Sequence, residues 1–179
     1  MTSWKNNNTL ESRRLVEETL NSVEKSGKVV AKDGIHLRKL IEKRIKEFGP
    51  NCDLNDIDVS RVTNMRHLFH GVEFNGDISK WDVSNVEDME YMFAYSIFNG
   101  DISNWDVSNV TDMSYMFYHS KFNGNISDLD VSNVKIMTGI FFSSPFNHDI
   151  SNWNIKNVKK KYDIFNGSKV QQKYKPLIK

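Results

Sequence analysis

Large apolar side chains recur along this chain at a fixed interval of 24 residues. The recurring positions include Phe74, Phe98, Phe122 and Phe146; Ile78, Ile102, Ile126 and Ile150; Trp81, Trp105 and Trp153; Val62, Val86, Val110, Val134 and Val158; Met65, Met89, Met113 and Met137; and Phe69, Phe93, Phe117, Phe141 and Phe165. One unit has too little apolar surface to form a core, whereas neighbouring units can bury these positions against each other. The period therefore predicts a stacked architecture.

The first half of each unit has the pattern of a short strand. Ile78, Trp81, Val83 and Val86 follow the spacing I-x-x-W-x-V-x-x-V, which is the leucine-rich-repeat spacing L-x-x-L-x-L-x-x-N with the last Asn replaced by Val. Side chains alternate across a strand, so Trp81 and Val83 are expected to point inward and Asp82 outward.

The second half of each unit has the spacing of a short helix. Apolar side chains within residues 86–93 stand at i, i+3, i+6 and i+7, which predicts a helix of about two turns. Ser84 and Glu87 are placed as a capping box at its start. Asn75 and Gly76, which both tolerate positive φ, are expected to form the turn into the next strand.

These patterns predict an α/β solenoid, a leucine-rich-repeat-like right-handed stack of about five 24-residue strand-plus-short-helix coils with an N-terminal helical cap. The pattern FNGDIS-x-WDVSNV-x-DM-x-YMF resembles the BspA-like leucine-rich repeats of bacterial surface proteins and mycoplasma-type lipoproteins, and the resemblance covers residues 51 to about 165. It implies a solenoid that works in adhesion or protein recognition, with no catalytic residues to transfer. The chain departs from the family pattern because it has no export signal or lipid-attachment cysteine near its start.

The two ends differ from the repeats. Residues 35–48 form an apolar stripe typical of a helix, residues 28–31 a short strand, residues 9–25 a weaker helix, and the first eight residues are expected to be disordered. We therefore divide the chain into a helical and strand cap at 1–50, a repeat solenoid at 51–165 and a basic C-terminal tail at 166–179.

Net charge is only +1, but it is unevenly distributed: residues 51–155 hold 15 acidic and 5 basic side chains, and both flanking segments are basic. No N-terminal apolar stretch has the length of a signal peptide and no apolar run reaches the length of a membrane span. The sequence thus predicts a soluble, cytoplasmic protein without membrane insertion, or a surface or secreted module if the chain is cut from a longer one. The single cysteine, Cys52, excludes an internal disulfide.

Carboxylates recur as regularly as the apolar residues. One column contains Asp58, Asp82, Asp106 and Asp130, and a second contains Asp53, Asp77, Asp101 and Asp149, with Asn125 in place of one aspartate. These side chains either cap the turn of each coil or form an acidic stripe for a basic partner. His67 and His70 are spaced to share a metal but lack a further ligand at a usual spacing. No nucleophile with a base, metal cluster or phosphate-binding loop is recognisable, so we expect no enzyme activity, metal or cofactor.

The leading hypothesis is a non-enzymatic protein-recognition module that binds an intracellular partner, and that can inhibit it by occlusion, through the outward strand face. That face consists of Lys80, Asp82, Asn104, Asp106, Asp128 and Asp130. Alternatives are a surface adhesin module and nucleic-acid binding through the basic end, which contains Lys156, Lys159, Lys160, Lys161, Lys169, Lys173 and Lys175. The same lysines can also protect the last coil from pairing with further strands, and an exposed last coil offers a route to homo-oligomers.

Overall fold

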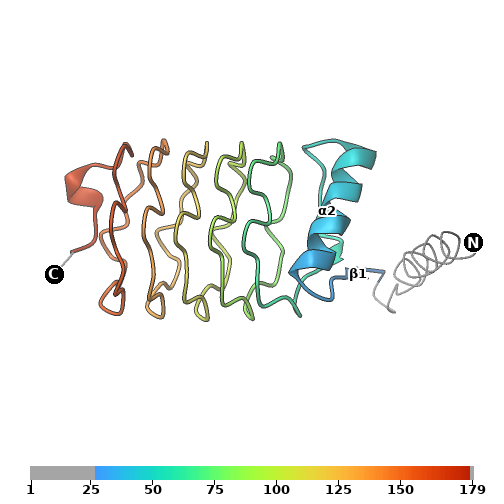
Figure 1. Ribbon diagram of the computed structural model, residues 1–179, viewed down its shortest axis with the longest axis horizontal. Coiled ribbons are helices and arrows are strands. Elements are labelled where there is room, and N and C mark those ends of the chain that lie inside the picture. The colour runs from blue at the N-terminus through green and yellow to red at the C-terminus, as the bar shows by residue number, and fades with distance from the viewer. Residues whose placement is uncertain (1–26, 178–179) are drawn as a thin grey trace, which may run out of the picture.

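The computed structural model describes residues 27–177, so the predicted helix at 9–25 and the predicted disorder of the first eight residues lie outside the described residues. Its regular elements are β1 (Val29–Val30), α2 (Gly34–Phe48), β2 (Ile57–Asp58) and the 3-10 helix η1 (Gln172–Tyr174). Figure 1 shows the chain between β2 and η1 winding into successive coils that lie side by side along the long axis, with α2 across the N-terminal end. None of the helices between residues 27 and 177 has the length and apolar character needed to cross a membrane.

Helix α2 lies where the apolar stripe predicts it. It begins after Asp33, whose Oδ1 accepts a hydrogen bond from the backbone N–H of His36 at 2.7 Å, and ends at Gly49, which has a φ of 87°. Leu37 and Ile41 are buried against the first coil. The preceding strand, β1, pairs in parallel with β2, which joins the cap to the stack.

Backbone hydrogen bonds connect each coil to the next in a constant register. The N–H groups of Met89, Tyr91, Phe93 and Tyr95 donate to carbonyl oxygens 23 residues further along the chain, at 2.8–3.0 Å. Equivalent bonds start from the coils that contain Met65, Met113 and Met137. Isolated parallel bridges mark the same register at Asn64, Asp88, Asp112, Ile136 and Lys160.

Turns replace the short helix expected at residues 86–93. The alternate N–H groups of this segment bond to the following coil and so are not available for helical bonds to the residue four positions back. Tyr91 and Tyr95 adopt positive φ values of 55° and 56°, which no α-helix contains. The helix-like spacing of apolar residues has another cause: Met89, Met92 and Phe93 are all buried in the core from a tight turn. Ser84 donates its hydroxyl to Asp82 and does not form a capping box with Glu87.

The apolar columns form the core between the two sides of each coil. Trp81 and Val83 are buried and Asp82 is exposed, as the alternation predicted, although this segment forms turns and not a regular strand. The phenylalanine rings of successive coils stack: centroids are 5.3 Å apart for Phe69 and Phe93 and 5.8 Å apart for Phe93 and Phe117. Each unit thus completes its core with rings from its neighbours, as expected for stacked repeats.

The Asn-Gly pair after each coil has a different role from the predicted positive-φ turn. Neither Asn75 nor Gly76 has a positive φ. Asn75 accepts the backbone N–H of Asn99 on its side-chain oxygen at 2.7 Å, and Asn99 does the same for Asn123. Gly76 is needed because an added Cβ would lie 1.9 Å from the carbonyl oxygen of Cys52.

The C-terminal segment continues the repeat, which the sequence did not reveal. Val170 is buried at the position of Phe146 in the preceding coil, and the N–H of Ile150 donates to the carbonyl of Tyr174 at 3.0 Å. Val170 and Tyr174 stand 24 residues after Phe146 and Ile150, so residues 169–177 build the first half of a further coil. Val170 and Tyr174 stand where the preceding coil has Phe and Ile, so the 24-residue pattern cannot be recognised here from the sequence alone.

Candidate functional site

The predicted outward face is exposed, but its aspartates are engaged in turn geometry. Asp82, Asp106 and Asp130 each accept the backbone N–H of the serine two residues later, at 3.0–3.1 Å. Side-chain and backbone hydrogen bonds from these serines hold the pKa values of Asp106 and Asp130 below the usual range. The residues of the neighbouring column, Lys80, Asn104 and Asp128, are exposed beside them.

The second aspartate column has the same arrangement. Asp77 and Asp101 accept the N–H groups of Ser79 and Ser103 at 2.9 Å, and Asn125, one coil later, accepts that of Ser127 at 3.1 Å. Backbone hydrogen bonds from the serines are the main cause of the lowered pKa values of Asp77 and Asp101. Because Asn125 makes the same bond without a charge, asparagine preserves the turn and removes only the carboxylate.

This geometry predicts an acid-dependent loss of stability. A carboxylate whose folded-state pKa is depressed stabilises the fold fully above its unfolded pKa of about 3.9, and this contribution disappears as the pH falls through the folded-state value. We expect the double substitution Asp77→Asn and Asp101→Asn to destabilise the protein at pH 6 and to have little effect at pH 2.5. Urea unfolding at both pH values measures this difference. An equal effect at both would show that these carboxylates do not contribute through their charge.

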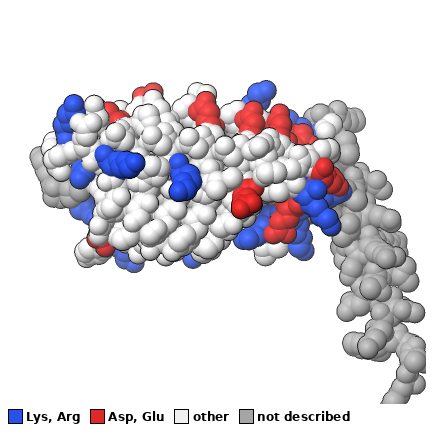
Figure 2. All heavy atoms as spheres, turned by 90° about the horizontal axis from the view of Figure 1, so that it is seen from above, with Lys and Arg blue, Asp and Glu red and all other residues white. Residues whose placement is uncertain are grey.

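The predicted lysines gather at the C-terminal end of the stack, apart from the aspartate columns. Figure 2 shows blue Lys and Arg atoms at the left, C-terminal end of the stack with few red atoms near them, whereas at the right, N-terminal end blue and red atoms lie together. The ammonium group of Lys175 lies 5.1 Å from the ring centroid of Phe165, and that of Lys173 lies 4.7 Å from the ring of Tyr174.

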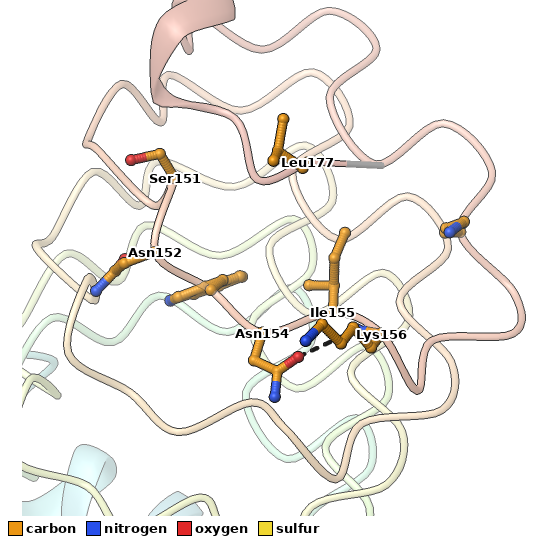
Figure 3. Close-up of a pocket in the computed structure, with 8 residues that line it drawn as sticks. Ser151, Asn152, Asn154, Ile155, Lys156 and Leu177 are labelled. Carbon is orange, nitrogen blue, oxygen red and sulfur yellow. Dashed lines mark hydrogen bonds between the residues drawn. The ribbon is translucent and has the colours of Figure 1, made fainter. Parts of the chain in front are cut away.

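A cavity of about 440 Å³ opens at the same end, between the last coil and the C-terminal segment. Figure 3 shows Leu177 above it, with Asn154, Ile155 and Lys156 below; the backbone N–H of Lys156 donates to the side-chain oxygen of Asn154 at 3.4 Å. Its lining combines the apolar side chains of Trp153, Ile155 and Leu177 with polar and basic ones, among them Ser151, Lys156 and Lys161.

Sequence analysis missed a surface of stacked aromatic rings on the turns that replace the expected helices. We call it the tyrosine–histidine face. It consists of His67, His70, Tyr91, Tyr95, Tyr115, Tyr118, His119 and Phe142.

Two rows make up most of this face. The rings of His67, Tyr91 and Tyr115 stack with centroid distances of 5.0 Å and 4.7 Å, and those of Tyr95 and His119 stack at 5.3 Å. All five residues have φ between 50° and 56°. Tyr95 is 53% exposed and the other members are partly or largely exposed. The first row ends at Gly139, where a Cβ would lie 2.6 Å from the Tyr115 ring.

The tyrosine–histidine face is largely uncharged at neutral pH. Burial raises the pKa of Tyr91, and a hydrogen bond with Tyr95 raises that of Tyr118, so both phenols keep their protons. Burial, and then the neighbouring His70, lower the pKa of His67 and favour its neutral imidazole. Arg66 pairs with Glu90 beside the first row, which places an ion pair at the rim of the face.

The histidines of this face pack against aromatic rings. His67 and His70 meet edge to face at a centroid distance of 5.3 Å, and His67 stacks on Tyr91. Within residues 27–177, no three His, Cys, Asp or Glu side chains come together in a way that could hold a metal ion. The histidines alone do not reveal the face, because each of its columns combines histidine with tyrosine at the 24-residue period. The signal was aromatic recurrence at the 24-residue period.

Comparison with known proteins assigns a family without assigning a function. No curated protein and no solved structure matches the chain. A family model described as "Mycoplasma protein of unknown function, DUF285" matches residues 37–144 and 98–175. The two matches overlap and together cover most of the coils and all of α2 after its first turn. The chain, with its stack of 24-residue repeats, therefore belongs to the DUF285 family of Mycoplasma proteins.

Proposed function

We propose that this protein is a non-enzymatic protein-recognition module that binds its partner through the tyrosine–histidine face. The observation that carries the proposal is the pair of exposed Tyr and His rows, in which rings from three successive coils stack at 4.7–5.3 Å. Tyr supplies a large apolar ring and a hydrogen-bonding hydroxyl with few rotatable bonds, and it is enriched at the centres of protein interfaces.

The stacked arrangement favours a protein over a small ligand. The ring faces of Tyr91 and Tyr115 are covered by their neighbours, so ring edges and hydroxyl groups are what the surface offers to a partner. Stacking also restricts the side chains before binding, which lowers the entropic cost of an interface. A broad, uncharged surface of this kind suits a protein partner, whereas small molecules bind in concave pockets.

We further propose that the coils form a leucine-rich-repeat-like solenoid of the BspA-like type, with a right-handed turn. The 24-residue apolar columns, the constant hydrogen-bond register between coils and the resemblance of FNGDIS-x-WDVSNV-x-DM-x-YMF to BspA-like repeats support this proposal. A solenoid would present the tyrosine–histidine face along its length, where it could occlude a site on the partner.

The acidic face predicted from sequence is the competing surface. Its aspartates already serve the turns, which weakens the case for a dedicated binding role but leaves their outer oxygens exposed. The two surfaces can be separated by mutation because their side chains belong to different turns of each coil.

Tagged protein would be incubated with lysate and bound proteins quantified by mass spectrometry. We expect the double substitution Tyr95→Ala and Tyr118→Ala to reduce capture of a specific partner at least about tenfold, because truncating interface tyrosines typically costs 1–2 kcal/mol or more each. Matched control protein would carry Asp106→Asn and Asp130→Asn. If capture fell with the control and persisted without the tyrosines, the acidic face would be the binding surface and this proposal would be wrong.

A further inference from the structure

Three of the chain's five histidines lie on the tyrosine–histidine face. The ring of His67 stacks on Tyr91 with centroids 5.0 Å apart and planes 8° apart, and that of His119 stacks on Tyr95 at 5.3 Å and 9°. His70 meets the same two tyrosines edge to face, at 6.2 Å and 5.6 Å. Each imidazole of the face therefore contacts one or both tyrosines of the same coil.

Ring packing alone does not require histidine at these positions. Tyr91 and Tyr115 occupy the position of His67 in the next two coils, and Tyr95 occupies that of His119 in the preceding coil. The two residue types differ in charge, because an imidazole gains a proton near about pH 6.5 whereas a phenol stays neutral up to about pH 10. Histidine in place of tyrosine thus keeps the aromatic ring and adds a charge that depends on pH.

The charged groups of the first two coils leave His67 neutral at neutral pH. Burial, followed by the neighbouring His70 and then Arg66, lowers the pKa of the His67 imidazole, while Asp88 acts in the opposite direction. Asp88 and Glu90 both pair with Arg66. Burial raises the pKa of Glu90, so any loss of its charge on acidification makes the surroundings more positive, as histidine protonation does.

The two ends of the face carry cations. At the N-terminal end, Arg38 of α2 donates to a backbone carbonyl of the face at 3.0 Å and pairs with Glu42 at 3.2 Å. At the other end, the ring of His119 lies 4.4 Å from that of Tyr118, and the next charged residue along the chain is the exposed Lys121. Arg38 and Lys121 would repel protonated histidines and would not neutralise them.

We propose that the tyrosine–histidine face binds its partner at neutral pH and releases it in mild acid, when His67, His70 and His119 become protonated. This inference rests on the proposed function, because it concerns regulation of the same surface. Docking removes the imidazoles from water and so favours their neutral form, which means that binding and protonation oppose each other. His67 and His70, with ring centroids 5.3 Å apart, would also repel each other once both are charged.

The fold should tolerate the same acidification. An imidazolium is attracted by the face of a tyrosine ring, so His67 and His119 can be charged in their stacked positions. The acidic face keeps its charge, because hydrogen bonds from serines hold the pKa values of Asp106 and Asp130 below the usual range. A change from pH 7.5 to pH 5.5 therefore acts on the tyrosine–histidine face and leaves the aspartate columns ionised.

The test measures partner capture at two pH values. Lysate adjusted to pH 7.5 or pH 5.5 would be incubated with graded amounts of immobilised full chain, which gives an apparent affinity for each captured protein. For the partner whose capture depends on Tyr95 and Tyr118, we expect an affinity at least about tenfold lower at pH 5.5, because each histidine whose pKa falls by one unit on binding contributes up to about tenfold. Equal or tighter binding at pH 5.5 would overturn the proposal. Unfolding of the free chain at pH 5.5, seen by circular dichroism, would overturn it too.

His67→Tyr with His119→Tyr separates the histidines from effects of pH on the partner. Whatever its affinity at pH 7.5, this variant should show a ratio of affinities between pH 7.5 and pH 5.5 at least about threefold smaller than that of the unsubstituted chain. The matched control, His36→Tyr with His148→Tyr, changes the two histidines outside the face and should keep the full ratio. Equal ratios for the two variants would show that pH acts elsewhere and would contradict the proposal.

Failure of this inference differs from failure of the proposed function. Capture that is lost with Tyr95→Ala and Tyr118→Ala but is the same at both pH values would keep the face as the binding surface and refute only its regulation. Capture at pH 7.5 that survives these tyrosine substitutions would refute the proposed function and, with it, the release in acid.

Discussion

Phe117→Ala is expected to lower the free energy of unfolding by about 3–5 kcal/mol, the largest effect of a single substitution in this account. Phe117 is 1% exposed, and its ring contacts Phe93, Phe122 and Phe141 at centroid distances of 5.8, 4.1 and 5.8 Å. Because these rings belong to three successive coils, alanine leaves a cavity that removes packing from both neighbouring interfaces. The loss would be measured by urea denaturation with fluorescence detection.

Phe48→Ala provides the matched control for this prediction. Phe48 lies at the end of α2 and is 66% exposed, so its truncation should change stability by less than about 1 kcal/mol. Similar losses for both substitutions would mean that the phenylalanine column does not hold the coils together.

Gly76→Ala is the second large effect, and we expect it to cost about 3 kcal/mol through overpacking. The added methyl group would lie 1.9 Å from the carbonyl oxygen of Cys52 in the preceding coil. A backbone atom cannot move aside as a side chain can, so the two coils would have to separate. Thermal and urea unfolding of the variant measure the cost.

Gly124→Ala is the control that tests whether the cost at Gly76 comes from its close approach to the Cys52 carbonyl or from the loss of any glycine in this turn. The nearest atom to its added Cβ is the Cζ of Phe122, at 2.8 Å, and the nearest backbone atom is 3.5 Å away. A ring can shift, so the expected cost is smaller, about 1 kcal/mol. Equal losses at both positions would contradict the role assigned to the Cys52 carbonyl.

Apolar recurrence in the sequence predicted which side chains form the core. Trp81 and Val83 are buried and Asp82 is exposed, because side chains that point inward pack against the equivalent side chains of the next coil. The stripe in residues 35–48 likewise predicted α2 to within one residue. The burial of these positions and the extent of α2 depend mainly on the order of apolar and polar side chains, which can be read directly from the sequence.

Backbone hydrogen bonding explains what the sequence could not predict. The spacing of Met89, Met92 and Phe93 fits both a helix and a turn that buries the same side chains, and the choice depends on bonds to the following coil. The left-handed φ of Tyr91 and Tyr95 follows from that choice, because tyrosine itself does not favour it. The tyrosine–histidine face was missed for the same reason: its members appeared to lie around a helix.

The function proposed for this DUF285 member is binding through an exposed surface. That surface is the aromatic tyrosine–histidine face along the coils. Binding at this face should change little with salt, because salt screens exposed charges and the face is largely uncharged. A cytoplasmic location and an inhibitory role remain predictions from the sequence.

Site-specific photo-crosslinking tests the central claim most directly. A photoreactive phenylalanine analogue would replace either Tyr118, on the tyrosine–histidine face, or Asp106, on the acidic face, and each protein would be irradiated in the same lysate. We predict one discrete protein adduct from position 118 and none from position 106. An adduct from position 106 alone would contradict the account and return the binding site to the aspartate columns.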